Sequence, residues 1–163
     1  MKRRNMIVSI IFLVAVDQVM KMIVSFFYMD HTFTITSWFG FHPYLNADQM
    51  SIFNNELNLN VDHRILITIE IVLLVLLFLC FVNIEKKYSN FKLVNTAIAM
   101  LMAGTVCSLI DLMFWGGSLD YILLFSKIID LKDVYLFAGG IMFLGLSMVM
   151  EIKEHIGKKE KNE

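Results

Sequence analysis

Four apolar segments dominate the 163-residue sequence and limit the folds that it can adopt. They run from about residue 6 to 29, 65 to 84, 93 to 115 and 134 to 152. A helix of about 20 residues crosses the ~30 Å hydrocarbon core of a membrane. With 58% hydrophobic residues, the chain is too apolar for a soluble domain of this size. We expect an all-α integral membrane protein in which residues 1–163 form one polytopic domain with four transmembrane helices.

The first segment follows the basic stretch Met1 to Arg4, as the apolar part of a secretory signal peptide does. It is too long for that role, however, and it carries Asp17, Gln18 and Lys21. No small-residue cleavage pattern follows it. We expect this segment to remain as the first transmembrane helix.

Basic residues flank the four segments unevenly, and the asymmetry predicts their orientation. They concentrate before the first segment, between the second and third, and after the fourth. The other two connections contain or adjoin only Arg64, Lys127 and Lys132. Because positively charged flanks stay inside the cell, we expect both termini to be cytoplasmic and these two connections to be exported.

The exported connection over residues 30–63 changes in composition. Thr32 to Phe39 is rich in β-branched and aromatic residues, which favour strands. Gly40, Pro43 and Asn46 then predict turns. We expect a small β-rich element on the membrane surface between the first and second helices.

Composition argues against several classes of partner. Cys80 and Cys107 fall inside apolar segments, and the four histidines show no metal-ligand spacing, so we expect no metal site. The net charge of -1 gives no indication of nucleic acid binding. Membrane lipids are the expected surroundings.

Asp17 and Lys21 lie four residues apart in the first segment, so they share one face of a helix and can pair. Gln18 is adjacent. Charged groups within a membrane are expensive and often functional. Structural pairing and a direct role in function are equally compatible with this spacing.

Three carboxylates stand where the third and fourth segments leave the membrane: Asp111, Asp120 and Asp133. Gly116 and Gly117 permit a turn that brings Asp120 back toward Asp133. Two carboxylates this close share one proton, so one acts as a base toward water and the other as an acid toward a peptide carbonyl. Helix capping by Asp130 and Asp133, with Asp120 in a solvated loop, is the alternative interpretation.

Over nearly its whole length the chain resembles the lipoprotein signal peptidase family, also called signal peptidase II. The matching residues are Asp17-Gln18-Val19-Met20-Lys21, Asn46, Ala103-Gly104, Asp111, Leu119-Asp120-Tyr121 and Asp133. The resemblance implies a bacterial enzyme of the cytoplasmic membrane whose active site faces the exported side. It implies Asp120 and Asp133 as the catalytic pair, which we expect to act as base and acid, supported by Asp17, Gln18, Lys21, Asn46 and Asp111. We add Lys132 to the supporting residues because of its charge, although it does not match the family.

The implied substrate is the signal peptide of a prolipoprotein, cleaved before a diacylglyceryl-modified cysteine. No cofactor is expected, because water is the nucleophile and carboxylates transfer its proton. We expect a monomer.

The chain departs from the family pattern at four positions beside these motifs. Ser108 replaces an asparagine, Leu112 an arginine, Asp130 an asparagine and Lys132 an alanine. Lys132 and Asp130 could supply the charge and hydrogen bonding that these changes remove. A non-catalytic relative that binds lipidated peptides or a membrane partner is the main alternative, and a small proton-coupled transporter is a weaker one.

Overall fold

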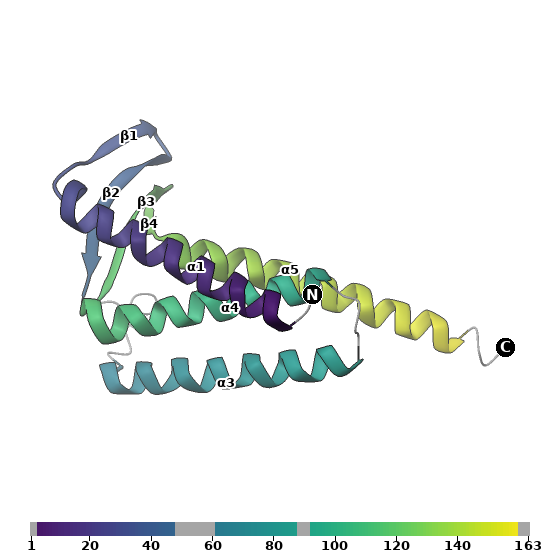
Figure 1. The fold of residues 1–163 in the computed structure, drawn as a ribbon. Coiled ribbons are helices and arrows are strands. Elements are labelled where there is room, and N and C mark those ends of the chain that lie inside the picture. Colours follow the sequence, from purple (N-terminus) through teal and green to yellow (C-terminus); the bar gives the residue numbers. More distant parts are fainter. Residues whose placement is uncertain (1–2, 48–60, 88–91, 160–163) are drawn as a thin grey trace.

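The computed structural model describes residues 3–47, 61–87 and 92–159. Within them, four helices are long and apolar enough to cross a membrane, as the sequence predicts (Figure 1). These helices are α1 (Arg3–Ile23), α3 (His63–Lys87), α4 (Lys92–Ile110) and α5 (Leu131–Lys159). α1 and α4 each continue into one wider π-helical turn, η1 (Val24–Tyr28) and η2 (Asp111–Trp115). Most of the predicted stretch 30–63 after Ala47 lies outside the described residues.

α4 is the central helix and packs against α1, α3 and α5. Of its apolar span, 56% is buried, against 11–17% for the other three. Small residues allow the close approach of α5, as is common between helices in membranes. A Cβ atom on Gly104 would lie 2.6 Å from Leu136 Cγ, and one on Gly139 would lie 3.0 Å from the Ala97 carbonyl oxygen.

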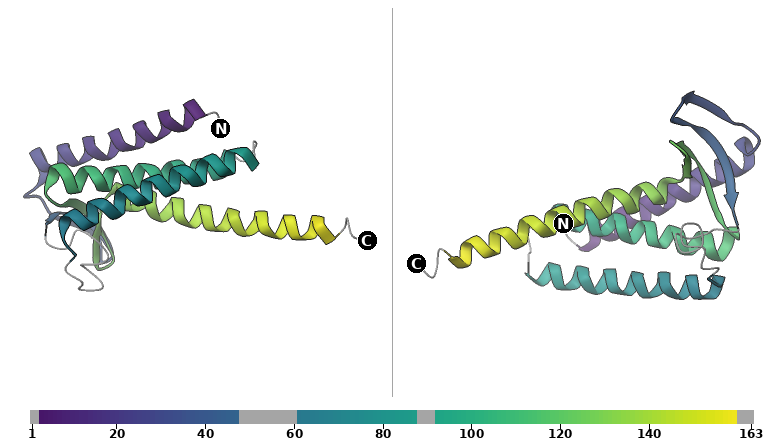
Figure 2. Two further views of the ribbon diagram at one scale, coloured as in Figure 1. Left: turned by 90° about the horizontal axis from the view of Figure 1, so that it is seen from below. Right: turned by 180° about the vertical axis from the view of Figure 1, so that it is seen from behind.

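A four-stranded antiparallel sheet covers one end of the bundle, which we call the sheet end (Figures 1 and 2). Its strands are β1 (Phe33–Thr36), β2 (Phe39–Asn46), β3 (Ser118–Leu124) and β4 (Lys127–Ile129), in that order. The sequence predicted a β element only between the first two membrane helices. The connection between α4 and α5 contributes the other half of the sheet, because β3 pairs with β2 along its length.

The predicted turns at Gly40, Pro43 and Asn46 are wrong, because these residues belong to β2. The turn falls earlier, at Ser37 and Trp38. Pro43 lies where the register between β2 and β3 shifts. Because the regular hydrogen-bond ladder is interrupted there, the N–H that proline lacks is not needed for strand pairing. Gly40 is required by contact rather than by a turn, since a Cβ atom there would lie 2.7 Å from the Phe33 carbonyl oxygen.

Two glycines carry the chain from η2 into β3. Gly116 has a φ of 68°, a left-handed conformation that ends the helix and that glycine adopts without strain. A Cβ atom on Gly117 would lie 2.7 Å from the Asn46 carbonyl oxygen, so only glycine lets β3 begin beside β2. The expected turn is present, and it leads into a strand rather than a loop.

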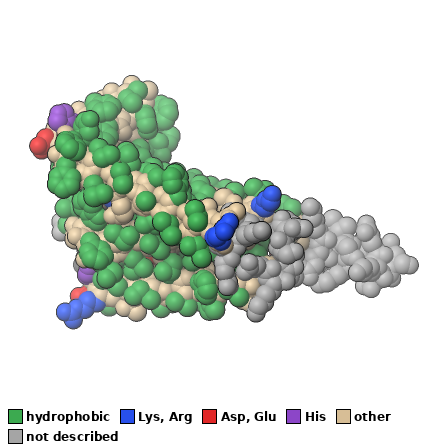
Figure 3. Space-filling view, viewed as in Figure 1, with side chains coloured by type: hydrophobic (Ala, Val, Ile, Leu, Met, Phe, Trp, Pro, Cys, Tyr) green, Lys and Arg blue, Asp and Glu red, His purple; other side chains and the backbone are tan. Residues whose placement is uncertain are grey.

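Hydrophobic side chains cover the face of the bundle seen in Figure 3, and charged side chains lie toward its ends. Exposed residues of this kind on the helices include Phe12, Val72 and Phe137. Such a surface suits lipid rather than water. The turns that join the strands also expose aromatic residues, among them Trp38 and Phe125, whose rings stack with centroids 5.8 Å apart.

Candidate active site

A cluster of buried charged residues lies at the sheet end, between α1, η2, β3 and the start of α5. We call it the polar cluster. Asp17, Lys21 and Asp130 are completely buried, and Asp111, Asp120 and Lys132 are nearly so. Asp133 is half-buried. The structure therefore brings together carboxylates and ammonium groups that are far apart in the sequence.

Two ammonium groups hold the cluster together by sharing the same two carboxylate oxygens. Lys21 Nζ lies 2.5 Å from Asp111 Oδ2 and 2.7 Å from Asp130 Oδ2. Lys132 Nζ lies 3.1 Å and 2.6 Å from those same two atoms. Lys21 also pairs with Asp17 at 3.2 Å, the contact that their spacing predicts. Buried charges of both signs thus compensate one another.

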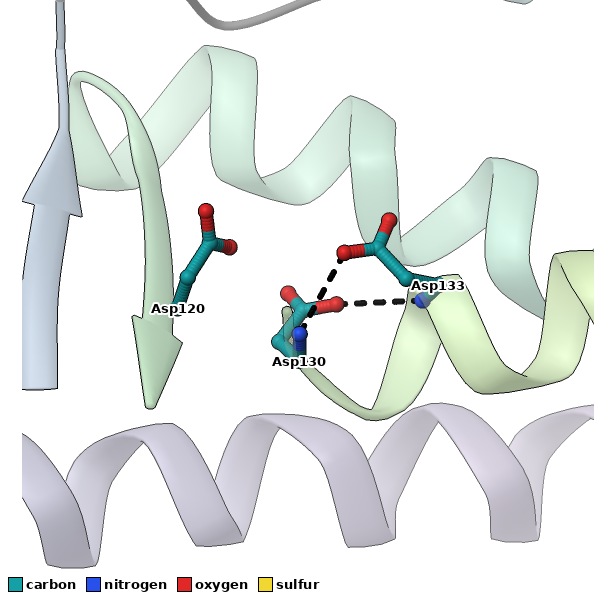
Figure 4. A group of neighbouring side chains, drawn as sticks. All are labelled: Asp120, Asp130 and Asp133. Atoms are coloured by element: carbon teal, nitrogen blue, oxygen red, sulfur yellow. Dashed lines mark hydrogen bonds between the residues drawn. The ribbon is translucent and has the colours of Figure 1, made fainter. Parts of the chain in front are cut away.

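Asp130 and Asp133 form a reciprocal hydrogen-bonded cap at the start of α5. The backbone N–H of Asp133 donates to Asp130 Oδ1 at 3.1 Å, and that of Asp130 donates to Asp133 Oδ2 at 3.3 Å (Figure 4). This is the capping-box arrangement, in which residues three apart satisfy each other's free N–H groups. The capping interpretation of these two residues is therefore correct, and the cap also fixes the Asp133 carboxylate in space.

Asp120 lies on β3, where it pairs with Tyr44 of β2. Ser118 Oγ donates a hydrogen bond to Asp120 Oδ1 at 2.6 Å. Burial raises the pKa of Asp120 to about 6, although Lys132 and the Ser118 hydrogen bond act in the opposite direction. The solvated-loop interpretation is wrong, because Asp120 is buried on a strand.

The carboxylates of Asp120, Asp130 and Asp133 face a common space beside β3 and α5 (Figure 4). One oxygen from each lies within 4.8 Å of the others. Three carboxylates at this distance could hold a cation. Lys21 and Lys132 already supply positive charge to Asp130, and we assign no metal here.

The pKa of Asp130 is shifted in the opposite direction from that of Asp120. Burial would raise its pKa, but Lys132 and Lys21 outweigh that effect and hold the pKa of Asp130 below its ordinary value. The pKa values of two buried carboxylates at the same site are thus shifted in opposite directions, upward for Asp120 and downward for Asp130. The arrangement keeps Asp130 ionised while Asp120 retains a proton more readily.

Gln18 links the cluster to η2. The indole N–H of Trp115 donates to Gln18 Oε1 at 3.0 Å, and Gln18 Nε2 donates to Asp17 Oδ2 at 3.1 Å. The Lys132 backbone N–H donates to the other oxygen of Asp17 at 3.2 Å. Asp17 therefore ties the start of α5 to α1, which is a structural role whatever else it does.

Asn46 ends β2 opposite Ser118, one strand away from the cluster. Ser108 donates to Glu70 Oε1 of α3 at 3.0 Å. Leu112 is buried in η2. Of the four departures from the family pattern, Asp130 and Lys132 thus lie within the cluster, while Ser108 directs its hydroxyl to another helix.

Sequence reasoning missed two contributors. Ser118 receives a hydrogen bond from Lys132 Nζ at 2.5 Å and donates one to Asp120. Trp115 orients Gln18. Ser118 was treated as part of the turn before Asp120, and the pairing of β3 with β2 makes its position evident. Trp115 was treated only as the end of the third apolar segment.

Two of three comparisons relate the chain to known proteins. The family model described as "Signal peptidase (SPase) II" matches residues 9–149. A search of curated proteins gives no match. A bacterial membrane enzyme solved by the in meso method at 2.3 Å has a TM-score of 0.74 and 20% identity, covering 94% of this chain and 92% of that one.

A second bacterial membrane enzyme structure, solved by the same method at 1.9 Å, has a TM-score of 0.70 and 21% identity. The match covers 88% of this chain and 92% of that chain. At these identities the likeness establishes the fold, and the family model establishes the relationship. The chain belongs to the signal peptidase II family, a family of bacterial membrane peptidases that process lipoproteins.

Proposed function

We propose that this protein is a membrane aspartic endopeptidase that cleaves the signal peptide of diacylglyceryl-modified prolipoproteins, with Asp120 and Asp133 as its catalytic pair. The observation that carries the proposal is their convergence: carboxylate oxygens of Asp120 and Asp133 lie within 4.8 Å, from elements separated in the chain. Family membership supports the substrate class.

The mechanism needs one proton shared between two carboxylates. The ionised member takes a proton from water, and the water oxygen bonds to the scissile carbonyl carbon. The protonated member donates its proton to the carbonyl oxygen as negative charge develops there. On collapse of the tetrahedral intermediate, the carboxyl that took the water proton donates it to the leaving amide nitrogen and the C–N bond breaks. The other carboxylate takes a proton from a hydroxyl of the intermediate, so the pair again holds one proton.

The environment of the pair supports the sharing of one proton. Burial and neighbouring carboxylates raise the pKa of Asp120 to about 6, so the pair holds a proton more readily than an exposed carboxylate does. Asp133 is held by its capping bond with Asp130. Both side chains come from rigid elements, a paired strand and a helix start, as precise catalysis requires.

We place the protein in the bacterial cytoplasmic membrane with both termini in the cytoplasm, the sheet end on the exported side and the chain acting as a monomer. The uneven distribution of basic residues supports this orientation. The exposed aromatic residues of the sheet would then lie at the level of the lipid head groups, where a lipidated cysteine would arrive.

Cleavage by the purified protein in detergent tests the proposal, with a synthetic diacylglyceryl-modified prolipoprotein peptide and its unmodified counterpart as probes. We expect cleavage before the modified cysteine. Binding of the lipidated peptide without cleavage at any pH would favour the non-catalytic relative instead. Equal cleavage of both peptides would overturn the proposed substrate class.

A further inference from the structure

We propose that Lys132 is a positioning residue for the catalytic pair, and that Lys132 and Asp130 act as a matched charge pair that leaves the shared proton on Asp120 and Asp133. This inference rests on the proposed function. It concerns how Asp130, a third aspartate, is accommodated beside Asp120 and Asp133, which share one proton.

Asp130 creates the difficulty that Lys132 resolves. It is completely buried, and one of its oxygens lies within 4.8 Å of oxygens of both Asp120 and Asp133. A third carboxylate at this distance competes for the proton that the pair must share. An asparagine could accept the same capping hydrogen bond without this competition.

Lys132 is placed to remove that competition. Its Nζ atom lies 2.6 Å from Asp130 Oδ2 but 3.9 Å from Asp120 Oδ1. The ammonium therefore stabilises the charge of Asp130 directly and that of Asp120 more weakly. Lys132 lies between Asp130 and Asp133 in the sequence. The first turn of α5 therefore positions both the Asp133 carboxylate and the Lys132 ammonium group.

Charged groups from every neighbouring element act on the same space. α1 contributes Asp17 and Lys21, and η2 contributes Asp111. From α3, Glu70 is near enough to interact electrostatically with Lys132. Within the polar cluster, two ammonium groups face five carboxylates, namely Asp17, Asp111, Asp120, Asp130 and Asp133. Removing either ammonium group enlarges the excess of carboxylates over ammonium groups in this buried space.

A different role for Lys132 is excluded by its contacts. Its Nζ atom lies 2.5 Å from Ser118 Oγ, a distance that would suit a serine nucleophile activated by a lysine base. Such a base must be neutral. Contact with the carboxylates of Asp111 and Asp130 keeps the ammonium charged, and the Ser118 hydroxyl donates to Asp120. Lys132 therefore acts through charge.

The two members of the charge pair affect Asp120 with opposite sign. Lys132 lowers the pKa of Asp120 and Asp130 raises it. Lys132→Met should therefore move the high-pH limb of kcat/KM upward, and Asp130→Asn should move it downward, each by about one pH unit. The double variant should return the limb toward its wild-type position, because both charges are gone.

The test is a pH profile of cleavage of the diacylglyceryl-modified peptide for wild type, both single variants and the double variant. We expect the high-pH limb of Lys132→Met to lie about one pH unit above that of wild type and the double variant to cancel most of that displacement. Lys92→Met, which removes an exposed lysine from the start of α4, is the matched control and should change neither quantity.

The outcomes separate the two claims. If wild type fails to cleave at every pH, the proposed function fails. If wild type cleaves but the limbs of the single variants coincide with its own, or the limb of the double variant stays displaced as far as that of a single variant, the charge-pair inference fails. If Lys132→Met does not fold, the other two variants still decide. A downward shift of the high-pH limb in Asp130→Asn, cancelled in the double variant, supports the charge-pair inference, and an unshifted limb in Asp130→Asn overturns it.

Discussion

Lys21 Nζ lies 2.5 Å from Asp111 Oδ2, so one buried ion pair joins α1 to the π-helical turn that follows α4. Both side chains are almost completely buried. The pair thus connects the first helix to the segment that leads into β3 and Asp120. We therefore expect stability and catalysis to depend on the same contact.

Lys21→Met should therefore lower the free energy of unfolding by about 3–5 kcal/mol, because Asp17, Asp111 and Asp130 would lose a buried partner. Unfolding in detergent measures the loss. Lys92→Met on the exposed start of α4 should change stability little. Equal stability of the two variants would contradict the role given to Lys21.

Gly104 tests the contact between α4 and α5. In Gly104→Ala the new Cβ atom would meet Leu136 Cγ at 2.6 Å and the Lys132 carbonyl oxygen at 3.2 Å. We expect a loss of about 1–3 kcal/mol from overpacking, together with reduced cleavage because the start of α5 shifts. Gly140→Ala on the open side of α5 is the control and should be neutral or stabilising, since no atom lies within 4 Å. Similar melting curves for both would argue against tight packing here.

The pH dependence of cleavage follows from the shared proton. Above the pKa of about 6 for Asp120, the pair loses its proton, so kcat/KM should fall as pH rises further. Ser118→Ala removes a hydrogen bond that favours ionised Asp120, which raises that pKa and moves the fall to higher pH. Ser147→Ala, within α5, should leave the profile unchanged. A rate that rises through this range, or a downward shift in Ser118→Ala, would contradict the assignment.

Trp115→Phe keeps an aromatic ring but removes the N–H that orients Gln18. We expect a loss of about 1 kcal/mol in stability and a decrease of less than about tenfold in cleavage, since Asp17 keeps its ion pair with Lys21. Trp38→Phe, in the exposed turn between β1 and β2, is the matched control for stability. Trp115→Phe should unfold at a lower temperature and cleave more slowly than Trp38→Phe. Equal unfolding temperatures and cleavage rates would show that the hydrogen bond from Trp115 to Gln18 is unimportant.

Local pattern was enough to predict the four membrane helices and the Asp17 to Lys21 pair. Both are encoded over short stretches, by about 20 apolar residues or by a spacing of one helical turn. The turn before Asp120 was also predictable from Gly116 and Gly117, because glycine permits the backbone that it requires.

The sheet and the Lys21 to Asp130 ion pair were not predictable in this way. β3 pairs with β2, although both α3 and α4 separate the two strands in the sequence. No local feature of either strand specifies so distant a partner. Tyr121 to Leu124 is strand-like in composition but was read as part of a connection. The contact of Lys21 with Asp130 depends on how α1 and α5 pack, so the charge pair that Lys132 completes became evident only in three dimensions.

Cleavage by Asp120→Asn and Asp133→Asn tests the central claim most directly, because an amide keeps each side chain's shape and, at Asp133, an oxygen for the cap. With Asp30→Asn as an exposed control, both variants should stay folded and lose cleavage of the diacylglyceryl-modified peptide by at least about a thousandfold, while the control retains it. Substantial cleavage by either folded variant would contradict the account of Asp120 and Asp133 as the catalytic pair.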